Sequence, residues 1–337
     1  MSLKELSALM RPEIENELRK QVARLDKPRT SPLHGMLSYH LGWTGEGSGP
    51  DAQGKRIRPL LLLLTSAACK ADWKNALPAA AAIELVHNFS LVHDDIQDNS
   101  SKRRGRDTVW VKWGIAQGIN AGDSLFVLSN QAILELLPIV PAEVVVEAAR
   151  ILHDTCLDLT RGQYLDISYE QRTDLTLEDY WSMVGCKTAA LLTACCSLGA
   201  LISGADKATQ EAYRDFGHYL GLAFQVQDDY LGIWGDAILT GKSADSDLIS
   251  RKKSLPVLFG LGKNAQFAKR WMNGPINNEN VPAIAGLLAA EGARLFTQET
   301  ADQMTDLAIA SLRRADPKGD AGDALYELAN NLLIREA

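Results

Sequence analysis

The sequence predicts an all-α protein. Apolar residues recur at steps of three and four through residues 3–25, which is the spacing that gives a helix one apolar face. No stretch sustains the alternation of a half-buried strand, and the Asn273-Gly274 pair runs into Pro275 instead of joining two strands. Several central runs are apolar nearly all round, as expected of buried helices.

Composition favours one soluble unit, a single domain over residues 1–337. The chain is 46% hydrophobic, which is ample for a large core, and its net charge of −7 argues against non-specific nucleic-acid binding. Residues 1–25 lack the apolar core of a signal peptide, and the apolar run at 60–69 is too short to span a bilayer. The five cysteines lack metal-ligand spacing, so we expect reduced core residues in a cytoplasmic protein.

The expected elements follow from apolar periodicity, punctuated by proline and glycine. In chain order they are an N-terminal amphipathic helix within 1–30, a glycine-rich loop at 41–54, an apolar helix to about residue 69, a helix from about residue 79, a basic loop at 99–108, helices over 121–137, 142–171, 177–204 and 208–232, a polar loop at 235–256, and three or four further helices.

The helix that begins near Ala79 ends in three carboxylates, Asp94, Asp95 and Asp98. Asp94 and Asp98 are four residues apart, so they share a helix face and repel each other by about 0.2–0.5 kcal/mol. Either water or a cation must cover such a pair. Oxygen ligands at this spacing suit Mg²⁺ together with substrate phosphates, although a solvated acidic helix end explains one isolated pair better.

A second acidic pair, Asp228 and Asp229, ends another apolar helical run. One such pair is common in proteins. Two pairs, each at the end of a hydrophobic helix, indicate the two walls of one metal site.

Basic residues cluster near both acidic pairs. They are Lys55, Arg56, Arg58, Arg103, Arg104, Arg106, Lys187, Lys242, Lys252 and Lys253. Each cluster alone is most often a solvated helix end, but Lys187 lies among alanine, leucine and cysteine and needs an anion. Together the charges predict Mg²⁺ held by the acids and a polyphosphate clamped by the cations. Nucleotide-binding glycine loops are absent from the sequence, so the phosphate is not expected to belong to a nucleotide.

Ordered motifs extend this pattern through most of the chain. They are Gly54-Lys55-Arg56-Ile57-Arg58-Pro59, the segment from His87 to Asp98, Arg103-Arg104-Gly105 with Thr108, Ala121-Gly122-Asp123, Gly162-Gln163 with Asp166, Lys187-Thr188, Phe224-Gln225 with Asp228-Asp229, and Lys252-Lys253-Ser254-Leu255-Pro256. The set resembles the trans-isoprenyl diphosphate synthases (polyprenyl synthetases) of short-chain type. That resemblance implies the single-domain isoprenoid synthase fold, with helices around a central apolar cavity.

The resemblance also implies a role for each motif residue. Asp94 and Asp98 would bind two Mg²⁺ ions and Asp228 a third, supported by Asp95 and Asp229. The allylic diphosphate would be held by Arg103, Lys187 and Lys252, with Lys242 closing from an active-site loop at 235–256. Isopentenyl diphosphate would be held without metal by Lys55, Arg58, His87 and Arg104. Thr188 and Gln225 would lie near the reacting carbons, where their oxygen dipoles stabilise positive charge.

Two positions depart from the family pattern, and two others bear on product length. Gly232 stands where many members have a third aspartate, and Arg251 lies in a region where glycine is frequent. Phe89 and Ser90 precede the first acidic motif, where the resemblance implies the floor of the product tunnel. We expect geranylgeranyl diphosphate as product, with farnesyl diphosphate close behind; the alternative is that Phe89 only packs the core.

Two other functions remain open at this stage. A class I terpene cyclase shares the fold and an acidic motif, but it needs no second diphosphate site, so Lys55, Arg58 and Arg104 favour the synthase. A non-catalytic partner subunit usually loses one acidic motif, and both are present here. A homodimer is expected from the resemblance alone.

Overall fold

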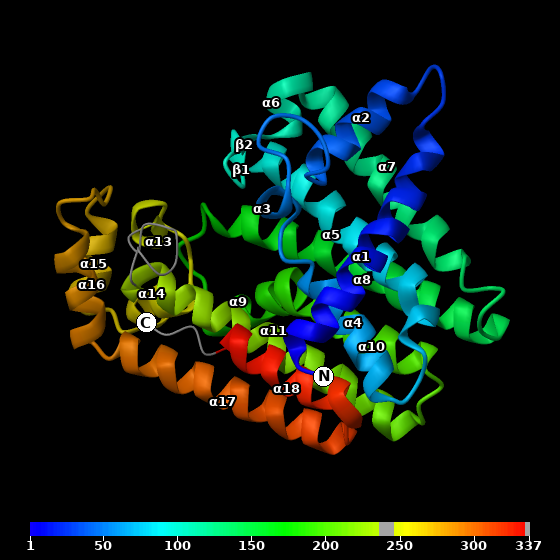
Figure 1. The fold of residues 1–337 in the computed structure, drawn as a ribbon. Coiled ribbons are helices and arrows are strands. Elements are labelled where there is room, and N and C mark those ends of the chain that lie inside the picture. The colour runs from blue at the N-terminus through cyan, green and yellow to red at the C-terminus, as the bar shows by residue number, and fades with distance from the viewer. Residues whose placement is uncertain (236–245, 334–337) are drawn as a thin grey trace. The chain divides into compact units, whose positions relative to one another are not determined.

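In the computed structural model, which describes residues 1–235 and 246–333, the chain is almost entirely helical (Figure 1). This confirms the all-α prediction. The chain forms two compact units, each built from several segments. Unit 1 comprises residues 1–156, 194–214 and 315–326, and unit 2 comprises residues 157–193, 215–314 and 327–337. The expectation of one domain over the whole chain stays a prediction.

Unit 1 contains the N-terminal helices and a small hairpin. Its elements are α1 (Leu3–Val22), η1 (Ala23–Leu25), α2 (Ser31–His40), α3 (Pro50–Gln53), α4 (Ile57–Ala68), η2 (Trp73–Ala76), α5 (Leu77–Gln97), β1 (Lys102–Arg103), β2 (Arg106–Asp107), α6 (Val109–Trp113) and α7 (Ile115–Leu134). The two-residue strands lie in the expected basic loop and are too short for a periodicity signal. Helix α7 begins six residues before the expected start because Gly114, at φ 85°, separates it from α6.

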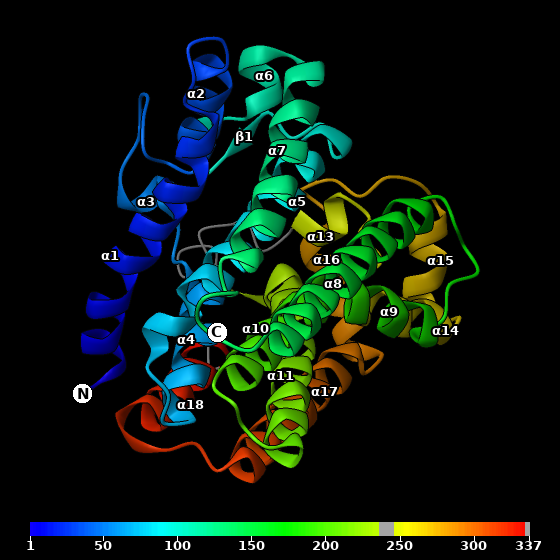
Figure 2. The same cartoon turned by 90° about the vertical axis from the view of Figure 1, so that its right-hand side faces the viewer.

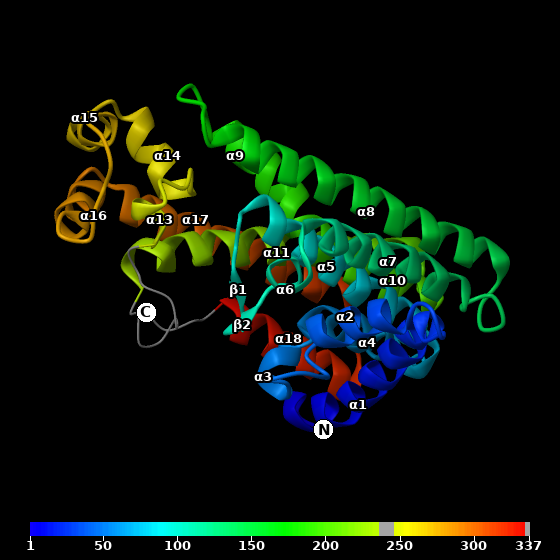
Figure 3. The same ribbon diagram turned by 90° about the horizontal axis from the view of Figure 1, so that it is seen from above.

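Unit 2 carries the second acidic pair. Its elements are α9 (Leu177–Val184), the π-helical turn η3 (Gly185–Ala189), α13 (Ser246–Ile249), α14 (Leu255–Gly262), α15 (Gln266–Met272) and α16 (Val281–Ala290). Figure 3 shows α14, α15 and α16 gathered together. Five helices contribute to both units: α8 (Ala142–Tyr169), α10 (Ala190–Ile202), α11 (Lys207–Trp234), α17 (Ala293–Ala315) and α18 (Gly319–Leu333). The expected polar loop at 235–256 thus contains α13 and the start of α14.

Helices α5 and α7 lie side by side in unit 1 (Figure 2). A glycine permits this approach, because a Cβ on Gly122 would lie 2.2 Å from Nε2 of His93. His93 in turn lies 3.7 Å from a carboxylate oxygen of Asp123. The Ala121-Gly122-Asp123 motif therefore sets the packing of α7 against the helix that carries the first acidic motif.

Among the residues that the structure describes, one helical stretch, Leu177–Ile202, is long and apolar enough to span a bilayer by composition. However, 61% of its most apolar window is buried within the protein, and Lys187 interrupts it. It is a core helix.

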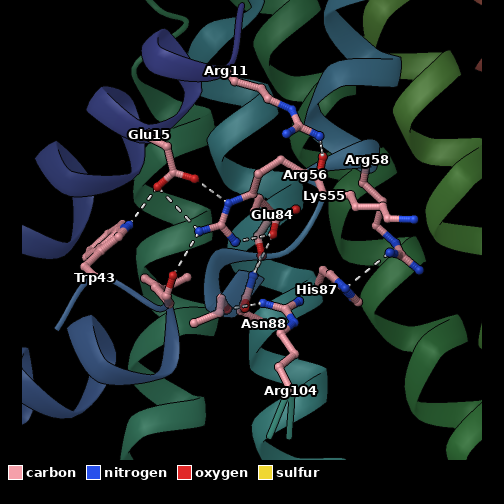
Figure 4. A network of polar contacts seen from close by, with 12 residues as sticks. Arg11, Glu15, Trp43, Lys55, Arg56, Arg58, Glu84, His87, Asn88 and Arg104 are labelled. Carbon is pink, nitrogen blue, oxygen red and sulfur yellow. Dashed lines mark hydrogen bonds and ion pairs between the residues drawn. The ribbon is translucent and has the colours of Figure 1, made fainter. Parts of the chain in front are cut away.

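A buried arginine anchors the loop that leads into α4 (Figure 4). The Arg56 side chain is 2% exposed; its Nε donates to Glu15 (2.6 Å) and its Nη1 to Glu84 (2.8 Å). Burial disfavours the charge, but the two carboxylates more than offset it, so the pKa of Arg56 is raised. The Arg56–Glu84 pair ties the loop to α5, and Asn88 of the same helix donates to Glu84 at 3.0 Å.

We predict that Glu84→Gln lowers the free energy of unfolding by about 3 kcal/mol, because it leaves a buried guanidinium short of one negative partner. Denaturant unfolding followed by circular dichroism measures this. Glu147→Gln, which breaks a surface pair with Arg150, is the matched control and should change the midpoint little. Equal midpoints for Glu84→Gln and the wild type would contradict this account of the loop.

Candidate active site

A cluster of basic side chains, the cationic pocket, lies where α4 begins: Arg58 and His87 are half-buried and Arg104 is exposed. Arg58 is in the first turn of α4, and its Nη1 lies 3.2 Å from Nε2 of His87 on α5 (Figure 4). Burial and then the neighbouring arginines Arg58 and Arg104 hold the pKa of His87 well below its usual range. The imidazole is therefore neutral, and Nε2 accepts from Arg58.

Positive charge in this pocket is only partly compensated. Burial lowers the pKa of Arg58 and of Arg104, which shows that the charged forms are held at a cost. Glu84 attracts both arginines but is bonded to Arg56. Within the part of the chain that the structure describes, the buried Nε of Arg58 has no hydrogen-bond partner. Such a pocket favours a compact anion.

The glycine of the Gly54–Pro59 motif makes room for Arg104. A Cβ on Gly54 would lie 2.7 Å from the guanidinium carbon, and Nη1 of Arg104 donates to the Ala52 carbonyl at 2.7 Å. Gly54 also has φ 78°, which favours glycine. Lys55 is exposed beside it, and its carbonyl accepts from Arg11. Three of the four expected isopentenyl ligands, Arg58, His87 and Arg104, are thus brought together.

The first acidic motif divides into outward and buried carboxylates. Asp94 is half-buried in the last turn of α5, and Asp98 is the exposed C-cap whose N–H donates to the Asp94 carbonyl at 2.8 Å. Asp95 is only 2% exposed, and Nε of Arg103 donates to both its oxygens at 2.9 and 3.0 Å. Burial raises the pKa of Asp95 although Arg103 opposes the shift. Arg103 is therefore paired with a carboxylate of the motif itself, Asp95.

The second motif divides in the same way. Asp228 is half-buried, whereas Asp229 is fully buried. Oδ2 of Asp229 accepts from the Tyr180 hydroxyl (2.8 Å) and from the Leu255 N–H (3.0 Å), the first residue of α14. Oδ1 accepts from Gln225 Nε2 (2.9 Å) and Lys252 Nζ (3.2 Å). Asp229 therefore joins α9, α11 and α14.

A cavity of about 140 Å³ in unit 2 brings together most of the residues expected there. Its lining includes Asp166, Tyr180, Lys187, Thr188, Gln225, Asp228, Asp229, Lys252 and Ser254. Lys187 forms an ion pair with Asp166, and this carboxylate is the anion that was predicted for a lysine among apolar residues. The Thr188 hydroxyl donates to Oε1 of Gln225 at 2.8 Å and so fixes the amide whose nitrogen reaches Asp229.

The turn that carries Lys187 and Thr188 is π-helical, a feature that the sequence analysis missed. Single π turns inside α-helices are frequent at functional sites. Two glycines admit its wider backbone: a Cβ on Gly162 would lie 2.4 Å from the Lys187 nitrogen, and one on Gly221 would lie 2.5 Å from the Ala189 Cα. Glycines inside helical patterns were the available signal.

Arg251 takes the backbone conformation that glycine would take. Its φ is 57°, and the side chain holds it there: Nη1 donates to the Gly274 carbonyl (2.8 Å) and Nη2 to the Trp271 carbonyl (2.9 Å). The guanidinium also lies 4.5 Å from the centroid of the Trp271 ring. The departure from glycine therefore leaves Lys252 free to reach Asp229.

Phe89 contacts two aromatic rings in unit 1. Its centroid lies 5.0 Å from His93 and 5.3 Å from Phe126 of α7. Ser90 Oγ donates to the His87 carbonyl at 2.8 Å. Phe126, Tyr180 and Asp247 were not singled out from the sequence, since each sits in an unremarkable local pattern. Lys242 lies outside the described residues.

The donor set suits magnesium. The outward groups are carboxylates, which are hard oxygen ligands. No cluster of three or more His, Cys, Asp or Glu side chains is arranged for a metal in residues 1–235 and 246–333. A magnesium ion would therefore be held by one or two carboxylates and completed by substrate oxygens, as is usual for this ion.

Comparison with known proteins identifies the family of the chain. A family model described as polyprenyl synthetase matches residues 49–285. The chain is 38% identical to the (2E,6E)-farnesyl diphosphate synthase of Mycobacterium tuberculosis, covering 95% of this chain and 90% of that protein. It is 41% identical to the geranylgeranyl diphosphate synthase of the same organism, covering 83% and 81%.

The fold agrees as well. A crystal structure of a polyprenyl synthetase from Streptomyces coelicolor superimposes with a TM-score of 0.87 at 37% identity, covering 99% of this chain and 100% of that one. The charged pocket, the two split carboxylate pairs and these matches lead to one conclusion: the chain belongs to the polyprenyl synthetase family of metal-dependent prenyltransferases and is a short-chain prenyl diphosphate synthase.

Proposed function

We propose that this enzyme condenses isopentenyl diphosphate with an allylic diphosphate and releases geranylgeranyl diphosphate, with farnesyl diphosphate as the nearest alternative product. The observation that carries the proposal is the cationic pocket of Arg58, His87 and Arg104, in which Arg58 and His87 are half-buried and the imidazole is neutral. It suits a diphosphate bound without metal. A terpene cyclase binds a single diphosphate and does not require a second, metal-free diphosphate site.

The residue roles follow from charge. When bound, three Mg²⁺ ions at Asp94, Asp98 and Asp228 would neutralise the leaving diphosphate. Lys187, Lys252 and Arg103 hold diphosphate oxygens once they turn from their own carboxylates, and Lys242 is proposed to close over them. Lys55, Arg58, His87 and Arg104 orient isopentenyl diphosphate so that its double bond faces the allylic carbon.

Bond changes in the condensation balance without a protein base. The allylic C–O bond breaks, and a C–C bond forms from the double bond of isopentenyl diphosphate. The proton lost afterwards goes to the released diphosphate. Thr188 and Gln225 direct oxygen dipoles toward the positive carbon, and the apolar helices exclude water from it. Five free cysteines in the described chain favour the reducing cytoplasm as its location.

A homodimer is also proposed, through an exposed apolar stripe on α7. The stripe is Ile115, Ile119, Val127 and Leu134, each 45–54% exposed and spaced for one helix face. Beside it lies a groove of about 750 Å³, lined by Arg24 and Lys27 as well as by Asp123 and Val127. A surface that offers apolar side chains and both charge signs can complement a second copy of itself.

The condensation is tested by product analysis with Mg²⁺, labelled isopentenyl diphosphate, and dimethylallyl, geranyl or farnesyl diphosphate in turn. We expect a twenty-carbon diphosphate from each starter. Arg58→Gln should raise KM for isopentenyl diphosphate by about 10-fold or more while changing KM for the allylic substrate little, because one charged hydrogen-bond donor is lost. A hydrocarbon formed from geranylgeranyl diphosphate alone, without elongation, would support a cyclase instead.

Phe89→Ala is expected to lengthen the product, because removing the ring opens space beside Phe126. Chromatography of the dephosphorylated products measures this. Phe296→Ala removes a ring stacked 4.3 Å from Phe259 on α14 and serves as the control that should keep the product length. An unchanged product profile for Phe89→Ala would mean that Phe89 only packs the core.

Ile119→Asp combined with Val127→Asp should dissociate the dimer, since it buries charge in an apolar contact. Light scattering after size-exclusion chromatography gives the mass. Leu295→Asp, at a residue 63% exposed on α17, is the control and should remain dimeric. A monomeric wild-type enzyme, or a double variant with the wild-type mass, would exclude this surface as the interface.

A further inference from the structure

The space that a side chain at position 232 would occupy is taken by the carboxyl group of Asp247. Residue 232 is four positions after Asp228 on α11, so the two share a helix face. A Cβ on Gly232 would lie 2.6 Å from Oδ2 and 2.8 Å from Cγ of Asp247. Any side chain at 232 would have to displace the Asp247 carboxyl group. Because Gly232 has no side chain, a carboxylate from another segment occupies this place.

Asp247 reaches this place from α13, the segment that also positions Lys252. Its carbonyl accepts from the Lys252 N–H at 3.0 Å, and its carboxylate lies 3.7 Å from Lys252 Nζ. The side chain is only 13% exposed. Lys252 thus lies between two carboxylates, Asp229 and Asp247.

Three carboxylates act on the ammonium group of Lys252. Asp229, Asp247 and Asp228 all raise its pKa, in that order and against burial. In this arrangement the lysine partly neutralises the acids until a stronger cation arrives. A divalent cation that brings a diphosphate would leave Lys252 free to turn toward the new anion.

We propose that Asp247 is the third carboxylate of the second acidic motif, supplied from α13 through the space left by Gly232, and that it increases the affinity of this site for a magnesium–diphosphate. The inference rests on the proposed function and adds a residue to its site. Asp247 acts as a positioning residue: it holds the Lys252 segment beside Asp229 and adds negative charge next to Asp228. Because Asp247 also bonds the backbone of Lys252, a cation that attracts the Asp247 carboxylate would also affect the position of Lys252.

A merely structural role for Asp247 predicts something different. Asp247 would then only stabilise the turn between α13 and α14, and its loss would lower stability without changing the magnesium requirement. The test must therefore measure cation dependence as well as folding.

The experiment titrates Mg²⁺ against binding of a non-ionising thiolo analogue of the allylic diphosphate, followed by calorimetry. Asp247→Asn should raise the magnesium concentration for half-maximal binding by about 10-fold, which is typical of lost support around a metal site. Asp302→Asn, which removes a carboxylate from α17, is the control and should match the wild type.

Gly232→Ala gives a second, independent variant. Alanine stabilises a helix relative to glycine, so this change should not unfold α11. It should nevertheless push the Asp247 carboxylate aside and weaken magnesium-dependent binding in the same direction as Asp247→Asn. The double variant Gly232→Asp with Asp247→Ala moves the carboxylate onto α11 and should recover most of the lost binding.

Three outcomes would overturn the proposal: an Asp247→Asn variant with the wild-type magnesium requirement, a Gly232→Ala variant that binds as the wild type does, or a folded double variant no better than Asp247→Asn. Failure of the proposed function is distinguishable, because it appears as absence of elongation by the wild-type enzyme, whatever the variants bind.

Discussion

Unit 2 depends on burying one carboxylate, Asp229. A buried, ionised carboxylate is tolerated only when hydrogen bonds and opposite charge replace water. Four donors from three segments meet that demand: Tyr180 of α9, Gln225 of α11 itself, and Lys252 and the Leu255 N–H at the start of α14. Satisfying it fixes the amide of Gln225, the start of α14 and the ammonium of Lys252 together. The hydrogen bonds to Asp229 therefore position the groups that lie around Asp228.

In unit 1 the buried ion is a cation, the guanidinium of Arg56, and carboxylates stabilise it. Arg56 is held by Glu15 and Glu84, and its fixed position sets the backbone between Lys55 and Arg58 (Figure 4). With Glu84 bonded to Arg56, the charge of Arg58 and Arg104 is only partly compensated. The stability of the loop and the affinity of the pocket for an anion therefore have one origin, which is the distribution of a few carboxylates among more cations.

The sequence predicted most helices, and the helical position of the acidic pairs, because both depend on local spacing. Apolar periodicity located most helices, and the four-residue step put Asp94 and Asp98 on one face. The π turn at Lys187 could not be predicted, since it depends on Gly162 and Gly221 from other helices. The entry of Asp247 beside Gly232 and the left-handed backbone of Arg251 also arise from contacts between segments distant in sequence.

The adjacent aspartates in each motif have different surroundings for a geometric reason. Consecutive helical residues point about 100° apart, so a pair at the edge of the core has one member inside and one outside. In both motifs the first member is half-buried and the second is buried against a basic residue, Arg103 for Asp95 and Lys252 for Asp229. These basic residues belong to the set proposed to bind the allylic diphosphate. Before substrate arrives they balance the buried acids, and a bound magnesium–diphosphate would exchange that balance for a new one. Substrate binding would then rearrange charge pairs at both motifs without requiring either unit to refold.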